Sequence, residues 1–96
     1  MELLENKTYG LTYGEPLENT LDAIRTRTPF DAGNMWGQAD LAGKFEVVSY
    51  NKVVASYIPE SGWKVTTTKR SRMATRHANI VRTALAGHAE YTEEEF

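Results

Sequence analysis

The apolar positions of residues 14–28 recur with the period of an α-helix. They follow one another at spacings of four, three and four residues: Leu17, Leu21, Ile24 and Thr28. Pro16 suits the first turn of a helix, and Pro29 forces the residue before it out of helical geometry. The pattern therefore predicts a short amphipathic helix over 14–28. The residues just before it, 7–14, are compatible with either a short edge strand or an extended arm.

Residues 44–68 have the composition of β-strands. Three runs are rich in valine, threonine and aromatic residues: KFEVVSY, VVASYI and WKVTTT. Asn51 and Lys52 form the first connection, and the proline and glycine of PESG at 59–62 favour a tight second turn. These residues predict a three-stranded antiparallel meander over 44–68. Adjacent valines in the first two strands indicate either a sheet covered on both faces or an association surface.

The stretch between these two elements, residues 30–43, contains many small and turn-forming residues and predicts a long loop. Trp36 in this loop has two interpretations. It packs beneath the loop as an anchor, which is the commoner role, or it is exposed as a contact for a partner protein. Tyr57 is a second candidate for such a protein contact.

The last periodic segment, residues 71–86, predicts a second amphipathic helix, whose apolar side chains fall in a sector about 140° wide. Ser71 can cap its start, and Gly87 is placed to end it. The fold class is therefore α+β: an N-terminal helix, the three-stranded meander, and a C-terminal amphipathic helix packed on the sheet, in a single domain over 1–96. The expected core consists of Leu17, Leu21, Ile24, Phe45, Val47, Val53, Ala55, Trp63, Val65, Met73, Ile80, Val81 and Leu85.

Charge is distributed unevenly along the chain, although the formal net charge is only −2. Residues 1–31 hold six acidic and three basic residues, and residues 61–88 hold six basic and no acidic residues. Residues 89–96 hold four acidic and no basic residues. Blocks of like charge are typical of interaction surfaces or tails. We expect a flexible acidic tail at 89–96 and, if the protein has a working surface, we expect it on the arginine face of residues 69–83.

Basic and polar residues gather on the outer face of the second helix and just before it. The candidate binding residues are Lys69, Arg70, Arg72, Arg76, Asn79 and Arg82. Arginine forks suit phosphate groups and guanine edges, and asparagine suits adenine edges, so this face is a candidate for nucleic-acid binding. Three alternatives stay open: an acidic protein partner, neutralisation by the chain's own acidic segments, and a plain solvated face.

The residue inventory argues against catalysis and against a bound cofactor. The chain has no cysteine, which suits a reducing compartment, and it has no glycine-rich phosphate loop, no H-E-x-x-H motif and no G-x-S-x-G motif. His77 falls in the apolar sector of the second helix, which favours a partly buried histidine hydrogen-bonded to a strand or loop. Its spacing from His88 does not match a metal site. We expect neither an enzyme nor a metal or cofactor site.

The segment 48–85 carries the motifs P-E-x-G-W and R-H within VSYNKVVASYIPESGWKVTTTKRSRMATRHANIVRTAL. This segment resembles a family of small bacteriophage proteins, common in phages of actinobacteria, whose shared core runs roughly YSYxTxIAxYxPExGWxVxxTKYSxTTSRHxxxVRRAL. The resemblance covers under half of the chain and departs from the family at Lys52, Val54, Arg70 and Ala74. The resemblance implies a phage origin and a small independent domain, and it does not imply any particular activity.

Together these observations predict a small phage-encoded, non-catalytic binding protein in the host cytoplasm, which docks a basic helix on nucleic acid or on an acidic surface of a host protein. The alternative is an inhibitor of a host factor or defence system, acting by protein–protein contact through the sheet face or the Trp36 loop. A homodimer formed through the strand faces is a third hypothesis. The longest apolar runs are about three residues, far short of the ~20 that span a bilayer, so we expect no membrane partner.

Overall fold

The computed structural model describes residues 14–69 and 71–96. The strands are β1 (Phe30–Asp31), β2 (Met35–Ala39), β3 (Phe45–Ser49), β4 (Lys52–Ile58), β5 (Gly62–Thr66) and β6 (Tyr91–Glu94). The helices are α2 (Gly14–Thr26) and α3 (Arg72–Leu85). The strand or arm suggested for 7–14 falls outside the described residues, except for Gly14, which begins α2.

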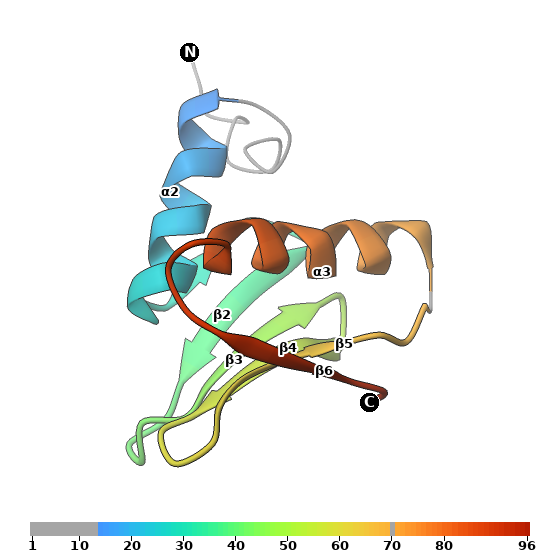
Figure 1. The fold of residues 1–96 in the computed structure, drawn as a ribbon. Coiled ribbons are helices and arrows are strands. Elements are labelled where there is room, and N and C mark those ends of the chain that lie inside the picture. The colour runs from blue at the N-terminus through green and yellow to red at the C-terminus, as the bar shows by residue number, and fades with distance from the viewer. Residues whose placement is uncertain (1–13, 70) are drawn as a thin grey trace.

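Within these ranges six strands form one mixed sheet, and both helices lie on the same side of it (Figure 1). Each strand lies beside its neighbour in the chain, so the sheet order is β1-β2-β3-β4-β5-β6. Adjacent strands are antiparallel except β5 and β6, which are parallel. The α+β class is confirmed, and the expected three-stranded meander is the middle part of a larger sheet.

Residues 30–43 do not form the expected loop, because they contain β1 and β2. Gly37 lies at the centre of β2, paired with Phe30 on one side and with Val47 on the other. A Cβ atom at this glycine would lie 2.4 Å from Cε1 of Phe30 and 2.6 Å from Cζ of Phe45. Two aromatic rings therefore pack directly over the backbone of this strand. The glycine that suggested a loop is required by the packing of a sheet.

The turn between β3 and β4 consists of Tyr50 and Asn51, one position earlier than the sequence predicts. Tyr50 adopts a left-handed φ of 58°, a conformation that is unfavourable for a bulky side chain. Two contacts hold it there. Its backbone N–H donates to the carbonyl of Asn34 at 2.8 Å, and its ring lies against the ring of His77, with 6.2 Å between centroids.

A β-bulge separates the two ends of the β3–β4 pair. Val47 pairs with Ala55 and Val48 pairs with Val53, which leaves Val54 without a partner in the register. Val54 and Ala55 are both fully buried, because a bulge can turn two successive side chains toward the same side. Val53, which the sequence places in the core, is only half-buried, and Val54 takes its place.

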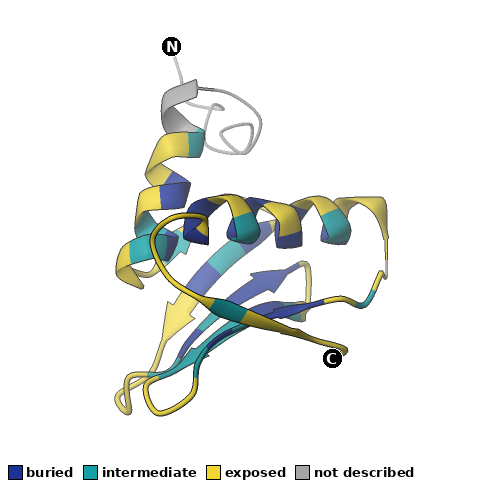
Figure 2. Ribbon diagram, in the orientation of Figure 1, coloured by how far each residue is buried: buried dark blue, intermediate teal, exposed yellow. Residues whose placement is uncertain are grey.

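The core lies between α3 and the sheet, with α2 packed against α3 (Figure 2). Ten of the residues expected in the core are buried there: Leu21, Ile24, Phe45, Val47, Ala55, Trp63, Val65, Ile80, Val81 and Leu85. Leu17 packs against them while half-buried. Met73 is 38% exposed, so its assignment to the core is wrong. It lies in the first turn of α3, where the helix extends toward solvent.

The opposite face of the sheet has no helix over it in the described chain. Trp36, Val48 and Val53 form a row across three neighbouring strands on this face. The three side chains alternate with Val47, which belongs to the core beneath α3. Trp36 is half-buried in this row. It is a residue of a strand rather than the anchor of a loop.

The helix α2 ends at Thr26, two residues before the predicted end. Arg27 adopts a φ of 56°, and its backbone N–H donates to the carbonyl of Ile24 at 3.1 Å. The N–H of Thr28 donates to the carbonyl of Ala23 at 2.8 Å. These two bonds form the left-handed helix ending that glycine usually supplies. Neither helix of the described ranges has the length and apolar character needed to cross a bilayer.

The second helix, α3, begins and ends where the sequence predicts. Ser71 accepts a hydrogen bond at Oγ from the N–H of Ala74 at 3.0 Å. Gly87 follows the last turn with a φ of 76°. From α2, the Nε of Arg25 donates to the carbonyl of Ala84 at 2.8 Å, which satisfies one of the free carbonyls near this helix end.

The expected flexible tail at 89–96 instead forms β6 beside β5. Tyr91 packs against the core, and the N–H of Thr67 donates to the carbonyl of Glu94 at 2.8 Å. The Lys64 Nζ lies 3.4 Å from the Glu94 carboxylate. Because α3 crosses from one end of the sheet to the other between these strands, β6 runs parallel to β5.

Candidate functional site

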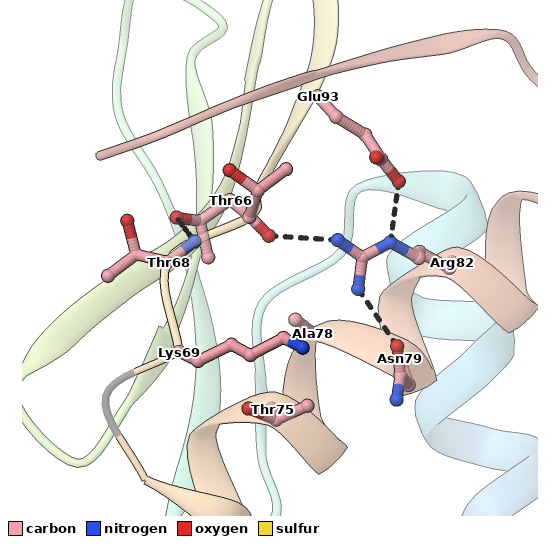
Figure 3. Close-up of a pocket in the computed structure, with 9 residues that line it drawn as sticks. Thr66, Thr68, Lys69, Thr75, Ala78, Asn79, Arg82 and Glu93 are labelled. Atoms are coloured by element: carbon pink, nitrogen blue, oxygen red, sulfur yellow. Dashed lines mark hydrogen bonds and ion pairs between the residues drawn. The ribbon is translucent and has the colours of Figure 1, made fainter.

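A cleft of about 370 Å³ opens between the end of β5 and α3, beside β6 (Figure 3). We call it the polar cleft, and it is lined by Thr66, Thr67, Thr68, Lys69, Thr75, Ala78, Asn79, Arg82 and Glu93. Three of the predicted binding residues, Lys69, Asn79 and Arg82, therefore meet at one site. Its other polar side chains come from a run of threonines and from the acidic strand β6.

The sequence TTTK at 66–69 forms the strand side of the polar cleft. β5 ends at Thr66, whose Oγ1 accepts a hydrogen bond from the N–H of Thr68 at 3.1 Å. This local bond competes with continued pairing in the sheet and leads the chain toward α3. The cleft thus forms where the chain leaves the last antiparallel strand and enters the basic helix.

Arg82 is held by three hydrogen bonds inside the protein (Figure 3). Its Nε donates to Glu93 Oε2 at 2.8 Å, and its two Nη atoms donate to Asn79 Oδ1 and to the carbonyl of Thr66, each at 2.9 Å. Arg82 therefore connects α3 to both β5 and β6. The sequence left neutralisation by the chain's own acidic segments open for the arginines of this face, and the structure shows it at Arg82, whose partner Glu93 comes from the presumed tail.

A second, more open hollow of about 440 Å³ lies on the solvent side of α3, and we call it the outer groove. It is lined by Arg72, Thr75, Arg76, Asn79, Ile80 and Thr83. Arg72 and Arg76 are exposed one turn apart, and neither forms an ion pair within the described part of the chain. Thr75 and Asn79 line both hollows, so the outer groove and the polar cleft form one polar surface across α3.

Several hydrogen-bond donors at the polar cleft have no partner among residues 14–69 and 71–96. Lys69 is exposed and forms no ion pair there. The hydroxyl groups of Thr67, Thr68 and Thr75 form no hydrogen bond within the same ranges. The cleft combines these groups with the positive charges of Lys69 and Arg82 and the single negative charge of Glu93. Of the predicted binding residues, Arg70 lies outside the described residues.

His77 is buried in the core, as the sequence predicts, and its partner is Ser49 at the end of β3. The Ser49 Oγ and the His77 Nδ1 lie 2.6 Å apart, and the two residues are 1% and 0% exposed. Burial, assisted by the nearby positive charge of Arg76, lowers the pKa of His77 from 6.5 to about 4. The imidazole is therefore neutral at pH 7. Because solvent reaches neither residue in this conformation, the pair links β3 to α3 as part of the core.

The two candidate protein contacts, Trp36 and Tyr57, lie on opposite faces of the sheet. Tyr57 packs against the core, 5.6 Å from the ring of Trp63, and the Arg27 guanidinium lies 4.3 Å from its ring centroid. Its ring is thus already engaged within the protein. Trp36 pairs with Val48 on the face without a helix. The structure does not bring the two aromatic residues together.

Among the described residues, no three His, Asp or Glu side chains gather as the ligands of a metal ion would. His88 is exposed just after α3. Six polar residues that line the two hollows were not selected by sequence reasoning: Thr66, Thr67, Thr68, Thr75, Thr83 and Glu93. The unbroken TTTK run just before the helix, and the four-residue spacing of Thr75 and Asn79, are the signals that could have identified most of them.

Comparison with known proteins adds no relative. No protein-family model, no curated protein and no solved structure matches the chain. The resemblance to phage proteins stays a prediction, and function is inferred from the surface chemistry of α3 and the residues around it.

Proposed function

We propose that the protein is a non-catalytic binding protein that docks α3 on nucleic acid. The proposal rests on three neighbouring basic residues that are exposed and form no ion pair in the described chain: Lys69, Arg72 and Arg76. Four other basic residues have carboxylate partners: Arg25, Lys44, Lys64 and Arg82. Two further basic residues of the described chain form no ion pair: Arg27, whose guanidinium lies over the ring of Tyr57, and Lys52 at the start of β4. Of the five unpaired cations among the described residues, three therefore lie on α3 or just before it.

The chemistry of this surface suits phosphate groups. Arg72 and Arg76 present guanidinium forks one helical turn apart, and Asn79 continues the row by another turn. Two side chains one turn apart can contact successive phosphates or base edges along a strand. An acidic surface on a host protein offers a similar field, and this second kind of partner is an outcome that the experiment below distinguishes.

The test measures binding of fluorescently labelled DNA and RNA oligonucleotides at increasing salt concentration. Affinity should fall steeply with salt, and the Arg72→Gln/Arg76→Gln variant should reduce the slope of log K against log salt by about two. The matched control, Lys44→Gln/Lys64→Gln, removes the same formal charge at two lysines that already have carboxylate partners and should leave the slope nearly unchanged. Absence of binding to any oligonucleotide at low salt overturns the nucleic-acid proposal and leaves an acidic protein as the partner to test.

A second candidate function is supported by the row of Trp36, Val48 and Val53 on the face of the sheet without a helix. Trp36 and Val53 are half-buried and Val48 is 6% exposed, and an aromatic residue among valines on a face without a helix is typical of protein contacts. This row favours an inhibitor that binds a host factor or a component of a defence system. A host partner captured after nuclease treatment and at high salt, and lost from the Trp36→Ser variant, supports it. Capture that survives in Trp36→Ser counts against it.

Phage origin and action in the host cytoplasm belong to the same proposal, and they rest on the resemblance of segment 48–85. Pairing of two copies through the strand faces is a further hypothesis. Light scattering tests it directly, since a monomer at high protein concentration excludes a homodimer of this kind.

A further inference from the structure

The polar cleft already contains an anion, which is the carboxylate of Glu93 (Figure 3). Glu93 Oε2 accepts a hydrogen bond from the Nε of Arg82 at 2.8 Å. This carboxylate belongs to β6, and its side chain is 46% exposed. An ion pair that is half in solvent is weak, so its carboxylate can be exchanged for another anion without unfolding the protein.

The remaining groups of the polar cleft are donors that the described chain does not satisfy. The side chain of Lys69 runs across the cleft toward Ala78 and Asn79 (Figure 3). The hydroxyl of Thr75 lines the same space and has no hydrogen-bond partner in the described ranges. A guanidinium has five N–H groups, of which Arg82 uses three in the bonds described above. Two N–H groups of Arg82 therefore remain.

We propose that the polar cleft binds a phosphate group, with Lys69, Thr75 and Arg82 as donors, and that Glu93 is its internal competitor. A terminal or free phosphate carries more negative charge than a carboxylate and accepts hydrogen bonds at three oxygens, which matches one ammonium, one guanidinium and a hydroxyl. A backbone phosphate carries one negative charge, like a carboxylate, and accepts hydrogen bonds at its two non-bridging oxygens. The source of the phosphate rests on the proposed function, because a nucleic acid docked on the outer groove would place its backbone beside the cleft. Free phosphate has the same chemistry, and the experiment separates the two sources.

The first arm titrates inorganic phosphate into the full-length ¹⁵N-labelled protein and follows the amide signals. The expected shifts are confined to the lining of the cleft, at Thr67–Lys69 and Thr75–Asn79. Lys69→Gln should abolish them, and this exposed side chain has no partner in the described structure whose loss would unfold the protein. Small shifts spread evenly over the surface of the protein overturn the proposal.

The second arm tests the competition with a matched pair of variants, Glu93→Gln and Glu95→Gln. Both remove one negative charge from the acidic strand region, but only Glu93 contacts Arg82. Glu93→Gln should bind phosphate about three- to fivefold more tightly than Glu95→Gln, which corresponds to the strength of an exposed ion pair. Equal affinities in the two variants overturn the role of Glu93. Thermal unfolding of both variants establishes that they are folded.

The third arm compares oligonucleotides that end in a 5′-phosphate or a 5′-hydroxyl with inorganic phosphate. Tighter binding of both oligonucleotides by Glu93→Gln than by Glu95→Gln identifies backbone phosphate as the ligand. An effect limited to the 5′-phosphate identifies a terminal phosphate, and an effect limited to inorganic phosphate identifies a free one.

Oligonucleotide binding that depends on Arg72 and Arg76 but is the same in both glutamate variants overturns the cleft site and leaves the proposed function standing. Binding of inorganic phosphate at the cleft without binding of any oligonucleotide supports the cleft site and overturns the proposed function.

Discussion

Ser49 and His77 are joined by a 2.6 Å contact between Oγ and Nδ1 across 28 positions of the chain. The contact ties the last residue of β3 to the middle of α3. The other ring nitrogen, Nε2 of His77, is buried without a hydrogen-bond partner in the described chain. A single hydroxyl thus provides the hydrogen bond of this buried ring, and the exposed ring of Tyr50 lies beside it.

The first prediction concerns acid stability. The pKa of His77 is about 4 in the folded protein, against 6.5 for an ordinary histidine, so between these values the unfolded chain binds a proton that the folded chain excludes. The free energy of unfolding should therefore fall by about 3 kcal/mol through this residue as the pH is lowered from 6.5 to 4. Urea unfolding of the wild type and of His77→Gln over this range measures the difference. Parallel pH curves for the two proteins would show that His77 does not contribute.

The second prediction concerns the hydroxyl of Ser49. Ser49→Ala leaves both ring nitrogens of His77 buried and unpaired, and it should lower the free energy of unfolding by about 1–3 kcal/mol. Ser61→Ala makes the same chemical change in the exposed turn between β4 and β5, where we expect an effect below about 0.5 kcal/mol. Urea unfolding at pH 7 compares them. Equal losses in the two variants contradict the importance of the Ser49–His77 contact.

The third prediction concerns Gly37, over which two aromatic rings pack. Gly37→Ala introduces a Cβ atom 2.4 Å from Cε1 of Phe30, and we expect a loss of about 1–3 kcal/mol in unfolding free energy. Gly62→Ala is the comparison, because its φ of 85° is unfavourable for alanine, but no atom lies within 4 Å of the added carbon.

The two glycine variants are separated by a second substitution. Phe30→Ala removes ring atoms that the new methyl group contacts, so adding it to Gly37→Ala should cause a smaller loss than the two single effects summed. The losses of unfolding free energy caused by Phe30→Ala and by Gly62→Ala should add up in the double variant. Additivity in both cases would show that the ring of Phe30 does not restrict position 37.

The fourth prediction concerns Arg82 as the connection between α3 and the acidic strand. Arg82→Gln removes the bonds to Glu93 and to the carbonyl of Thr66, so β6 should detach more often from β5. The amide of Thr67, which donates to Glu94, should then exchange its hydrogen faster, with a loss of about 1–3 kcal/mol in overall stability. Arg76→Gln, which removes an exposed and unpaired arginine, should leave this amide unchanged. Equal exchange in both variants contradicts the connection.

The parts of the fold that were predictable from the sequence are those set by local signals. The helical period at 71–86, the cap at Ser71 and the valine-rich runs at 44–68 each depend on residues close together in the chain. β1 and β2 were not predictable in this way. Phe30 and Phe45 pack over the backbone of Gly37 and leave no room for a side chain there, and this contact exists only once the strands have paired.

The types of residue that form the candidate site were predictable from the sequence, but the contacts between them were not. The absence of acidic residues between 61 and 88 drew attention to Lys69, Arg72, Arg76 and Asn79, which line the polar cleft or the outer groove. The structure shows that internal neutralisation, one of the alternatives from the sequence, applies to Arg82 and to Lys64. A run of glutamates has the composition of a solvated tail, and only tertiary contacts show that it forms a strand.

The parallel pairing of β6 also sets an order of assembly. β1 to β5 pair as successive hairpins between chain neighbours, which requires only short loops to close. β6 meets β5 only after α3 has crossed the sheet, so its pairing closes the longest loop and should come last. Until β6 pairs, Arg82 lacks the Glu93 carboxylate that neutralises it in the folded protein. We therefore expect a chain whose β6 has not yet docked to be more electropositive at this face than the folded protein.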